Sequence, residues 1–380
     1  MRICFFGTYT LAEGYPVNRV LLNGLQRIGV EVVQCREELW EGFLHQTFSQ
    51  RRWSTYWRLG WRLCRCYARL MCRYRRMGEH QWVIVGYAGY LDVLLARLLV
   101  RRRRPVALVA FISLYDTIVR DRGQLAENSW TARAVKSFER LGFSWADLVV
   151  VDTAEHGKYL AELHGLPPAK FQRSFVGEDD ELFRPLPPPA ASPVFRVLFF
   201  GTYVPLHGVE TVVAAADHLR GVEGVELVLV GNGQLYPAIR QRADRLGLPN
   251  LRFVDQWLSP EALREQVAGA DVCLGIFGQT AKAGRVIPLK VFDTLALGRP
   301  LITRDSPAIR ELLEDGKSAL FCPAGDGRAL AAAILRLKEA PQLRAALARE
   351  GRACFAARAT PEAIARALVG SLEQHGEKRA

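Results

Sequence analysis

The chain has 380 residues, 49% of them hydrophobic, and a formal net charge of +12 at pH 7. This length suits two domains, and this apolar content excludes a chain that is disordered beyond its ends. The excess of positive charge favours an anionic partner, which is phosphate, nucleic acid or an acidic membrane surface.

The first half predicts a parallel sheet, because short continuous apolar runs alternate with helical patterns. We expect strands at Ile3–Phe6, Val30–Val33, Trp82–Val85, Val106–Ile112 and Leu148–Val151. The opening MRICFFGTYT is itself a strand and lacks the long apolar segment of a signal peptide. No stretch reaches the length of uncharged apolar residues that a membrane span requires, so we expect no transmembrane helix.

Residues 51–76, RRWSTYWRLGWRLCRCYARLMCRYRR, hold nine arginines and no acid. Helical spacing gives one arginine stripe and one opposite face of apolar and aromatic residues, which are Trp57, Trp61, Cys64, Tyr67, Leu70 and Met71. Such a helix can lie in a membrane interface, with its Trp face in the acyl boundary and its arginines on lipid phosphates. The alternative is an ordinary helix that packs its Trp face on the domain and leaves its arginines in water.

We therefore predict an anionic membrane surface as a partner of residues 51–76. Nucleic acid could use the same stripe, but no nucleic-acid recognition module is visible, so we expect none. The eight cysteines have neither metal nor disulfide spacing, which predicts reduced thiols in a cytoplasmic protein. Together these features predict a cytoplasmic protein attached peripherally to the inner face of the membrane.

Candidate ligand residues follow the strands of the first half, at the sheet edge where open α/β folds bind ligands. Gly7 and Gly14 bracket the loop after the first strand, and Asn18 and Arg19 begin the next helix. A helix cap and a surface charge explain Asn18 and Arg19 equally well. Asp116 follows the fourth strand.

Asp152 and His156 follow the fifth strand. Asp152 or Thr153 suits a helix N-cap, with Glu155 near the third helical position. His156 is a candidate catalytic residue, and a purely structural histidine is the alternative.

A proline-rich segment divides the chain. Residues 184–193 hold five prolines in ten residues, which predicts a semi-rigid linker over 178–194. Residues 1–177 then form an N-terminal domain and residues 195–358 a C-terminal one. Residues 359–380 predict a last helix and tail, of which the helix from Pro361 can reach back across the linker.

The second half repeats the alternation of strands and helices. We expect strands at Val197–Phe200, Val225–Val230, Leu251–Val254, Val272–Ile276 and Leu301–Thr303. Two such series imply two doubly wound sheets. The sequence Phe-Phe-Gly-Thr-Tyr occurs at 5–9 and again at 199–203, each time at the end of the first strand of a half.

Two segments of the second half suit a phosphate. Gly231 follows the strand VELVLV, where glycine lets backbone approach a ligand. Residues 287–298 predict a helix, with Lys282 and Arg285 before its N-terminus and Lys290 in its first turn. Cations, free N–H groups and the positive helix dipole at one place predict a diphosphate site. Asp293 would lie on the same face and accept hydrogen bonds from a ribose diol; the alternative is a surface Lys290–Asp293 pair.

These residues resemble glycosyltransferase family 4, the retaining transferases of the GT-B fold. The similar segments are FGTYVPLHGVETVVAAA, VELVLVGNG, RVIPLKVFDTLALGRPLIT, SPAIRELLEDGKSALFCPAGD and FVGEDDELFRP. The resemblance covers the second half well and the first half loosely. It implies two Rossmann-like α/β domains that face a cleft, the acceptor on the first and the nucleotide on the second, with a C-terminal helix crossing back.

The resemblance also assigns donor residues. Asp293 takes the place of the second Glu of the family's E-x7-E motif, which binds the nucleotide ribose, and the first Glu falls at Arg285. The family's diphosphate-binding Arg and Lys fall at Thr202 and His207, after Gly201. Because Thr202 and His207 stand where the family has cations, we expect that Lys282, Arg285 and Lys290 supply the missing positive charge. The family needs no metal or other cofactor, and the chain has no D-x-D to hold a divalent ion.

The sequence thus predicts transfer of a sugar from a UDP or GDP sugar to a glycan or lipid-linked acceptor, with retention of configuration. The catalytic candidates are His156, Asp116 and Arg285, and the acceptor candidates are Gly7, Gly14, Asn18 and Arg19. One rival is a GT-B sugar-nucleotide epimerase, against which Arg285 in place of Glu argues weakly. Another is a non-catalytic binding or scaffold protein, which Thr202, His207 and Arg285 keep open.

Overall fold

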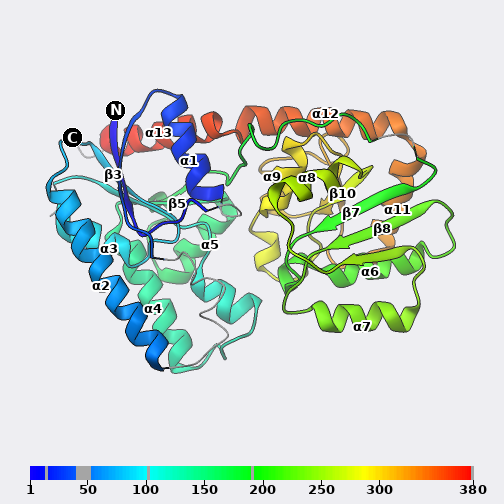
Figure 1. The fold of residues 1–380 in the computed structure, drawn as a ribbon, viewed down its shortest axis with the longest axis horizontal. Helices are drawn as coiled ribbons and strands as arrows, with labels where there is room; N and C mark the ends of the chain where they lie inside the picture. Colours follow the sequence, from blue (N-terminus) through cyan, green and yellow to red (C-terminus); the bar gives the residue numbers. More distant parts are fainter. Residues whose placement is uncertain (13–15, 40–52, 101–102, 190–191, 378–380) are drawn as a thin grey trace. The chain divides into compact units, whose positions relative to one another are not determined.

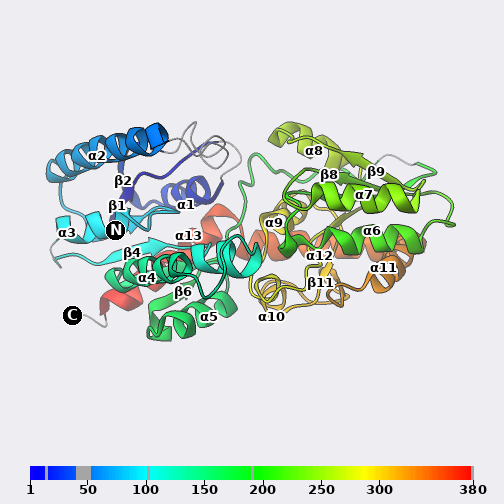
Figure 2. The ribbon, with the colours of Figure 1, turned by 90° about the horizontal axis from the view of Figure 1, so that it is seen from below.

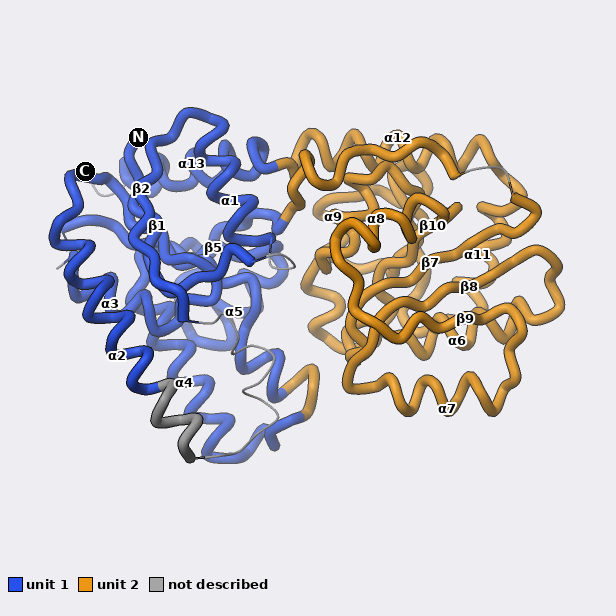
Figure 3. The backbone as a smooth tube through the Cα atoms, viewed as in Figure 1, with its two compact units in different colours: residues 1–119, 124–176, 361–380 blue, residues 120–123, 177–360 orange. Residues whose placement is uncertain are grey.

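The computed structural model describes residues 1–12, 16–39, 53–100, 103–189 and 192–377, with side chains in the first long helix from residue 60 onward. The chain divides into two compact units (Figure 3). Unit 1 comprises residues 1–119, 124–176 and 361–380, and unit 2 comprises residues 120–123 and 177–360. Each unit holds one parallel sheet of six strands (Figure 1).

The sheet of unit 1 has the order β2-β1-β3-β4-β5-β6. Its strands are β1 (Arg2–Gly7), β2 (Glu31–Arg36), β3 (Trp82–Val85), β4 (Val106–Val109), β5 (Leu148–Val151) and β6 (Phe171–Arg173). The five predicted strands are present. The sequence analysis missed β6, since Phe-Gln-Arg at an edge position has no apolar run.

Helices cover both faces of this sheet. They are α1 (Pro16–Arg27), α2 (Trp53–Arg75), α3 (Asp92–Val100), α4 (Trp130–Trp145), α5 (Ala154–His164) and α13 (Pro361–Glu377), with the short helices η1 (Asp116–Asp121) and η2 (Pro168–Lys170). Ile3 and Phe5 pack toward α1 and α13, while Cys4 and Phe6 pack toward α2, α3 and α4. The last helix α13 therefore returns to the unit built by the first half, as predicted.

The sheet of unit 2 has the order β12-β11-β10-β7-β8-β9. Its strands are β7 (Phe195–Phe200), β8 (Val225–Val230), β9 (Leu251–Val254), β10 (Val272–Leu274), β11 (Leu301–Arg304) and β12 (Leu320–Cys322). Five of these were predicted, and β12 was missed because its three residues are too short a run. Two doubly wound α/β sheets confirm the predicted fold class.

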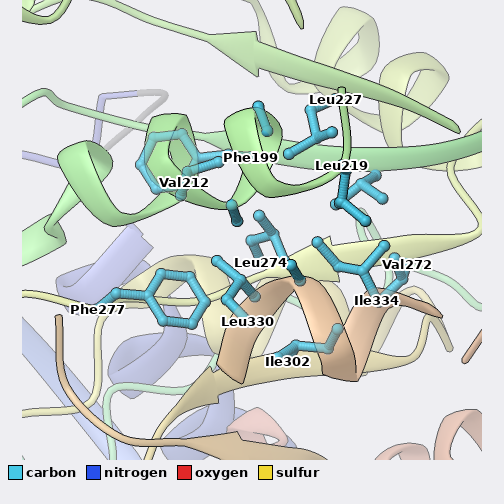
Figure 4. Close-up of a cluster of buried hydrophobic side chains, with 14 of the residues drawn as sticks. Phe199, Val212, Leu219, Leu227, Val272, Leu274, Phe277, Ile302, Leu330 and Ile334 are labelled. Carbon is cyan, nitrogen blue, oxygen red and sulfur yellow. The ribbon is translucent and has the colours of Figure 1, made fainter. Parts of the chain in front are cut away.

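The helices of unit 2 are α6 (Val209–His218), α7 (Tyr236–Leu246), α8 (Pro260–Ala268), α9 (Leu289–Ala296), α10 (Pro307–Arg310), α11 (Gly327–Glu339) and α12 (Pro341–Arg358), with η3 (Pro205–His207) and η4 (Lys282–Gly284). Figure 4 shows one of its core layers, in which strand residues such as Phe199 and Leu274 meet Val212 of α6 and Leu330 of α11. Such burial of apolar area holds α6 and α11 on one face of the sheet.

Part of the predicted membrane helix belongs to the core of unit 1. Leu70 of α2 is fully buried, and Tyr67, Met71 and Tyr74 pack beside it. Over this stretch the alternative of an ordinary packed helix is confirmed, because its apolar face is taken up by the sheet. Trp61 is 67% exposed, and the side chain of Trp57 lies outside those described. No helix in the described part of the chain has an apolar stretch long enough to cross a bilayer.

Candidate functional site

The two Phe-Phe-Gly-Thr-Tyr segments form matching turns. Gly7 ends β1 with φ +130°, and Gly201 follows β7 with φ +129°, a region that favours glycine. The sheet orders also match, since β1 lies between β2 and β3 and β7 lies between β8 and β10. By this correspondence α3, which follows β3, is the counterpart of α9, which follows β10.

In unit 1 a carboxylate of the chain itself fills this turn. Asp92, the first residue of α3, accepts hydrogen bonds at Oδ2 from Thr8 N (2.6 Å) and Thr8 Oγ1 (3.0 Å). The Tyr67 hydroxyl donates to Asp92 Oδ1 at 2.9 Å. A Cβ atom on Gly7 would lie 2.5 Å from Asp92 Oδ2. Gly7 therefore leaves room for Asp92, and its predicted part in acceptor binding stays a prediction.

In unit 2 the corresponding place holds a cation. Lys290, in the first turn of α9, brings its Nζ to 3.0 Å from where a Cβ on Gly201 would lie. The same Nζ lies 3.7 Å from the centroid of the Phe199 ring. Lys290 is 5% exposed, and within the described residues its Nζ has no hydrogen-bond partner. A buried unpaired ammonium is unfavourable, so burial lowers the pKa of Lys290 well below its usual value. An anion at this turn would satisfy the ammonium.

His207 flanks the same turn. Its Nδ1 donates to Thr202 O, which leaves Nε2 as the acceptor of a neutral ring. Its Cε1 lies 3.5 Å from the Cβ position on Gly201. Burial is the main cause that lowers the pKa of His207 well below its usual value. The positive charges of Lys290 and, more weakly, of Arg122 lower this pKa further. Sequence reasoning missed Arg122, which lies in the short segment 120–123 of unit 2.

Asp293, one turn after Lys290, has a second carboxyl as its partner. Asp293 is 5% exposed and hydrogen-bonds the side chain of Glu178, which is 2% exposed. Burial raises the pKa of Asp293 well above its usual value, and the charge and hydrogen bond of Glu178 raise it further. The two carboxyls therefore share a proton. The alternative of a surface Lys290–Asp293 pair does not hold, because both side chains are buried.

Glu178 was not foreseen as a site residue. It lies in the FVGEDDELFRP segment, which the sequence analysis gave only as one of the segments similar to the family. Nothing in its local pattern separates Glu178 from the acidic residues that follow it.

Gly231 is required by the packing of backbone on backbone. Its φ is +120°, and a Cβ there would lie 2.2 Å from Gly201 O. The turns after β7 and β8 thus touch directly, and Gly231 holds the Gly201 turn in place. Its predicted role, close approach of backbone to a ligand, stays a prediction beside this contact between the two turns.

The other two predicted cations lie before α9. Lys282 begins η4 and is 6% exposed, and Arg285 follows η4 and is half-buried. Pro288 is the N-cap of α9 rather than a residue of its first turn. Of the three cations, Lys290 is the one shown to reach the Gly201 turn.

The catalytic candidates of unit 1 are fully buried. Asp116 accepts a hydrogen bond from the Tyr159 hydroxyl at 3.0 Å. His156 Nδ1 lies 2.5 Å from Asp152 Oδ1, and Thr153, rather than Asp152, is the N-cap of α5. Both side chains are buried in the free chain, and their predicted catalytic roles stay predictions.

The structure shows little that supports acceptor binding by the other residues predicted to bind the acceptor. Asn18 is 1% exposed and donates to Thr10 O (3.1 Å) and Tyr87 O (2.9 Å), so it joins two loops. Arg19 is half-buried. Gly14 lies outside the described residues.

Residues 194–340 match the family described as glycosyl transferases group 1. The chain is 22% identical over 258 residues to a chitobiosyldiphosphodolichol beta-mannosyltransferase of Debaryomyces hansenii, covering 61% of this chain and 53% of that protein. It is 30% identical over 152 residues to a phosphatidyl-myo-inositol mannosyltransferase of Mycolicibacterium smegmatis, covering 39% and 37%. The chain thus spans about half, or less, of the length of these curated relatives.

Solved structures share the fold over nearly the whole chain. Sucrose-phosphate synthase from Thermosynechococcus elongatus has a TM-score of 0.72 and 17% identity, with 100% of both chains covered. Anabaena HepE in complex with UDP has a TM-score of 0.68 and 16% identity, covering 98% of this chain and 100% of that one. Residues 194–340 are therefore a glycosyl transferases group 1 domain, set in a chain that has the two-sheet fold of GT-B glycosyltransferases.

Proposed function

We propose that this chain transfers a sugar from a UDP or GDP sugar to a glycan or lipid-linked acceptor, as a retaining glycosyltransferase of family 4. One observation carries the proposal. The Gly201 turn holds a buried ammonium that has no hydrogen-bond partner among the described residues, at the place where its counterpart in unit 1 holds a carboxylate. In unit 1 the hydrogen-bonded anion is Asp92, and in unit 2 the anion of a ligand would take that place, beyond the electrostatic attraction of Asp293 for Lys290.

A nucleoside diphosphate fits this turn. Its phosphates would accept hydrogen bonds from Lys290 Nζ and from the backbone that follows Gly201, with Lys282 and Arg285 adding positive charge. His207 would add charge only when it takes up a proton on binding. The hydroxyls of its ribose would bind the carboxyl pair of Asp293 and Glu178. The structure of HepE with UDP and the names of the mannosyltransferase relatives support a nucleotide sugar.

The step that these cations would serve is the departure of the diphosphate. The bond between the anomeric carbon and the phosphate oxygen breaks, the acceptor oxygen bonds to that carbon, and the acceptor proton passes to the leaving diphosphate. Negative charge develops on phosphate oxygens, where preorganised donors act most strongly. In the family that the chain resembles, the donor phosphate takes the acceptor proton, which is the route that retention would use.

Incubation with a panel of UDP and GDP sugars tests the proposal, with products followed by proton NMR. We expect sugar transfer or slow hydrolysis of one donor, with the anomeric configuration retained in the first product. Conversion of the donor into another nucleotide sugar would show an epimerase instead. Tight nucleotide binding without turnover of any donor would show a binding protein.

Nucleotide binding should weaken as pH rises. The pKa values of Lys290 and His207 are lowered in the free protein, and an adjacent diphosphate raises both, so binding takes up protons. Between about pH 7 and pH 9 the charge of UDP is nearly constant, because its last phosphate pKa lies near 6. Calorimetry in two non-phosphate buffers of different ionisation enthalpy should show this uptake. Proton release by the wild type would contradict the assignment.

A further inference from the structure

Three helices of unit 1 expose cations and no acids within their described residues, although α5 on the same face of the sheet exposes Glu162. The helices α2, α3 and α4 cover the same face of the sheet, and α3 contacts both of the others (Figures 1 and 2). The acids within their described residues are Asp92 and Glu139, which are 3% and 0% exposed. Every exposed charge on the described parts of α2, α3 and α4 is therefore positive. The exposed cations are Arg65, Arg69, Arg73, Arg75, Arg133 and Arg140.

Four of these arginines lack a counter-charge within the described part of the chain, and one of them is Arg75 at the end of α2. Glu37 forms ion pairs with Arg69 (3.5 Å) and Arg73 (3.0 Å), so part of the charge of these two arginines is neutralised within the unit. Arg65 on α2 and Arg133 and Arg140 on α4 have no ion pair among the described residues. Solvated guanidinium groups without acids nearby attract an anionic surface.

Large apolar side chains stand among these cations, one on each helix. Trp61 of α2 is 67% exposed, Leu98 of α3 is 62% exposed and Trp130 of α4 is 79% exposed. Trp and Arg together suit the boundary between lipid headgroups and acyl chains.

We propose that the outer surface of α2, α3 and α4, called here the α2–α4 surface, docks on an anionic lipid bilayer. The side of α2 that meets lipid differs from the one expected from sequence. Tyr67 and Leu70 lie in the core, so α2 presents its arginine stripe together with Trp61. Exposed Trp and Leu favour a bilayer over nucleic acid, which has no apolar interior to receive them. This inference does not rest on the nucleotide site.

Sedimentation with vesicles tests the α2–α4 surface. We expect the whole chain to bind vesicles of equal parts phosphatidylglycerol and phosphatidylcholine, and to bind pure phosphatidylcholine weakly. Replacing Arg65, Arg133 and Arg140 by Glu should lower the partition coefficient more than about a hundredfold, since each cation contributes roughly fivefold or more. Added salt should weaken binding by the wild type.

Unit 2 supplies matched controls. Arg242→Glu, Arg328→Glu and Arg336→Glu together make the same change of net charge at exposed positions of unit 2, and should leave vesicle binding nearly unchanged. Trp61→Ser with Trp130→Ser should lower binding about tenfold or more. Trp257→Ser should not, although Trp257 is as exposed as Trp61, at 67%.

Three results would overturn the proposal: no preference for phosphatidylglycerol, equal losses in the two triple variants, or binding of single-stranded RNA through the same arginines without vesicle binding. Stabilisation by UDP reports on unit 2 separately. Loss of UDP binding in Lys290→Met with vesicle binding intact would leave the α2–α4 surface unaffected.

Discussion

Replacing Lys290 by Met should remove nucleotide binding without destabilising the protein. Met fills the space of the Lys stem beside Phe199 and Gly201 but carries no charge. The loss of this donor should lower the transfer rate about 10²–10³-fold and abolish stabilisation by UDP. The melting temperature without ligand should hold or rise, because an unpaired ammonium no longer has to be buried. Thermal melts with and without UDP measure both effects.

Lys317→Met is the matched control, since Lys317 is exposed in unit 2 and pairs with Glu314 at 2.9 Å. That variant should keep its response to UDP. Unchanged stabilisation of Lys290→Met by UDP would remove Lys290 from the nucleotide site. A strong loss of intrinsic stability would instead assign Lys290 to the fold.

Gly231→Ala should be among the most destabilising single changes in unit 2. Its new Cβ would lie 2.2 Å from Gly201 O, and its φ of +120° is one that residues with a side chain rarely adopt. We expect a loss of about 3 kcal/mol or more in the free energy of unfolding, from overpacking and backbone strain together. The Gly201 turn must move to relieve the contact, so UDP binding should weaken as well. Denaturant unfolding with a UDP titration measures both.

The variant Gly247→Ala is a control that separates the cost of backbone strain from the cost of a steric clash. Gly247 has φ +58° but nothing within 4 Å of its Cβ position, so Ala there should cost only about 1–2 kcal/mol. Equal losses in the two variants would show that the contact between Gly231 and Gly201 contributes nothing.

The strands were predictable where they are buried on both faces. In Val225–Val230 only Glu226 interrupts the apolar run and the other five residues are buried, so β8 was found with its exact bounds. Phe171–Arg173 and Leu320–Cys322 pair at sheet edges, where pairing with a single neighbour fixes a strand that has too few residues for a pattern. Such strands depend on their neighbours more than on their own sequence.

The nucleotide site was predictable in its location but not in its chemistry. The spacing of Lys290, Asp293 and Gly298 indicated a charged helix start after β10. It did not reveal that Lys290 is buried beside Gly201, or that Asp293 pairs with Glu178, more than a hundred positions earlier. Such pairs arise only when distant segments pack together. The contrast between Asp92 and Lys290 is visible only when the two folded turns are compared with each other.

For the helix α2, the sequence predicted the two faces but could not predict what each face contacts. Its periodicity gave the two faces correctly, but an apolar face packs equally well on a sheet or in lipid. The burial of Tyr67 and Leu70 decides for the sheet over their part of the helix. The exposed residues of α3 and α4, which no periodicity joined to α2, extend the cationic surface beyond one helix.

A crystal structure with UDP tests the central claim most directly. We predict that the diphosphate lies at the turn after β7, within about 3 Å of Lys290 Nζ and of backbone N–H groups after Gly201. The carboxyl pair of Asp293 and Glu178 would then lie at the ribose. A diphosphate bound elsewhere, with Lys290 Nζ still against the Phe199 ring and unpartnered, would contradict the account.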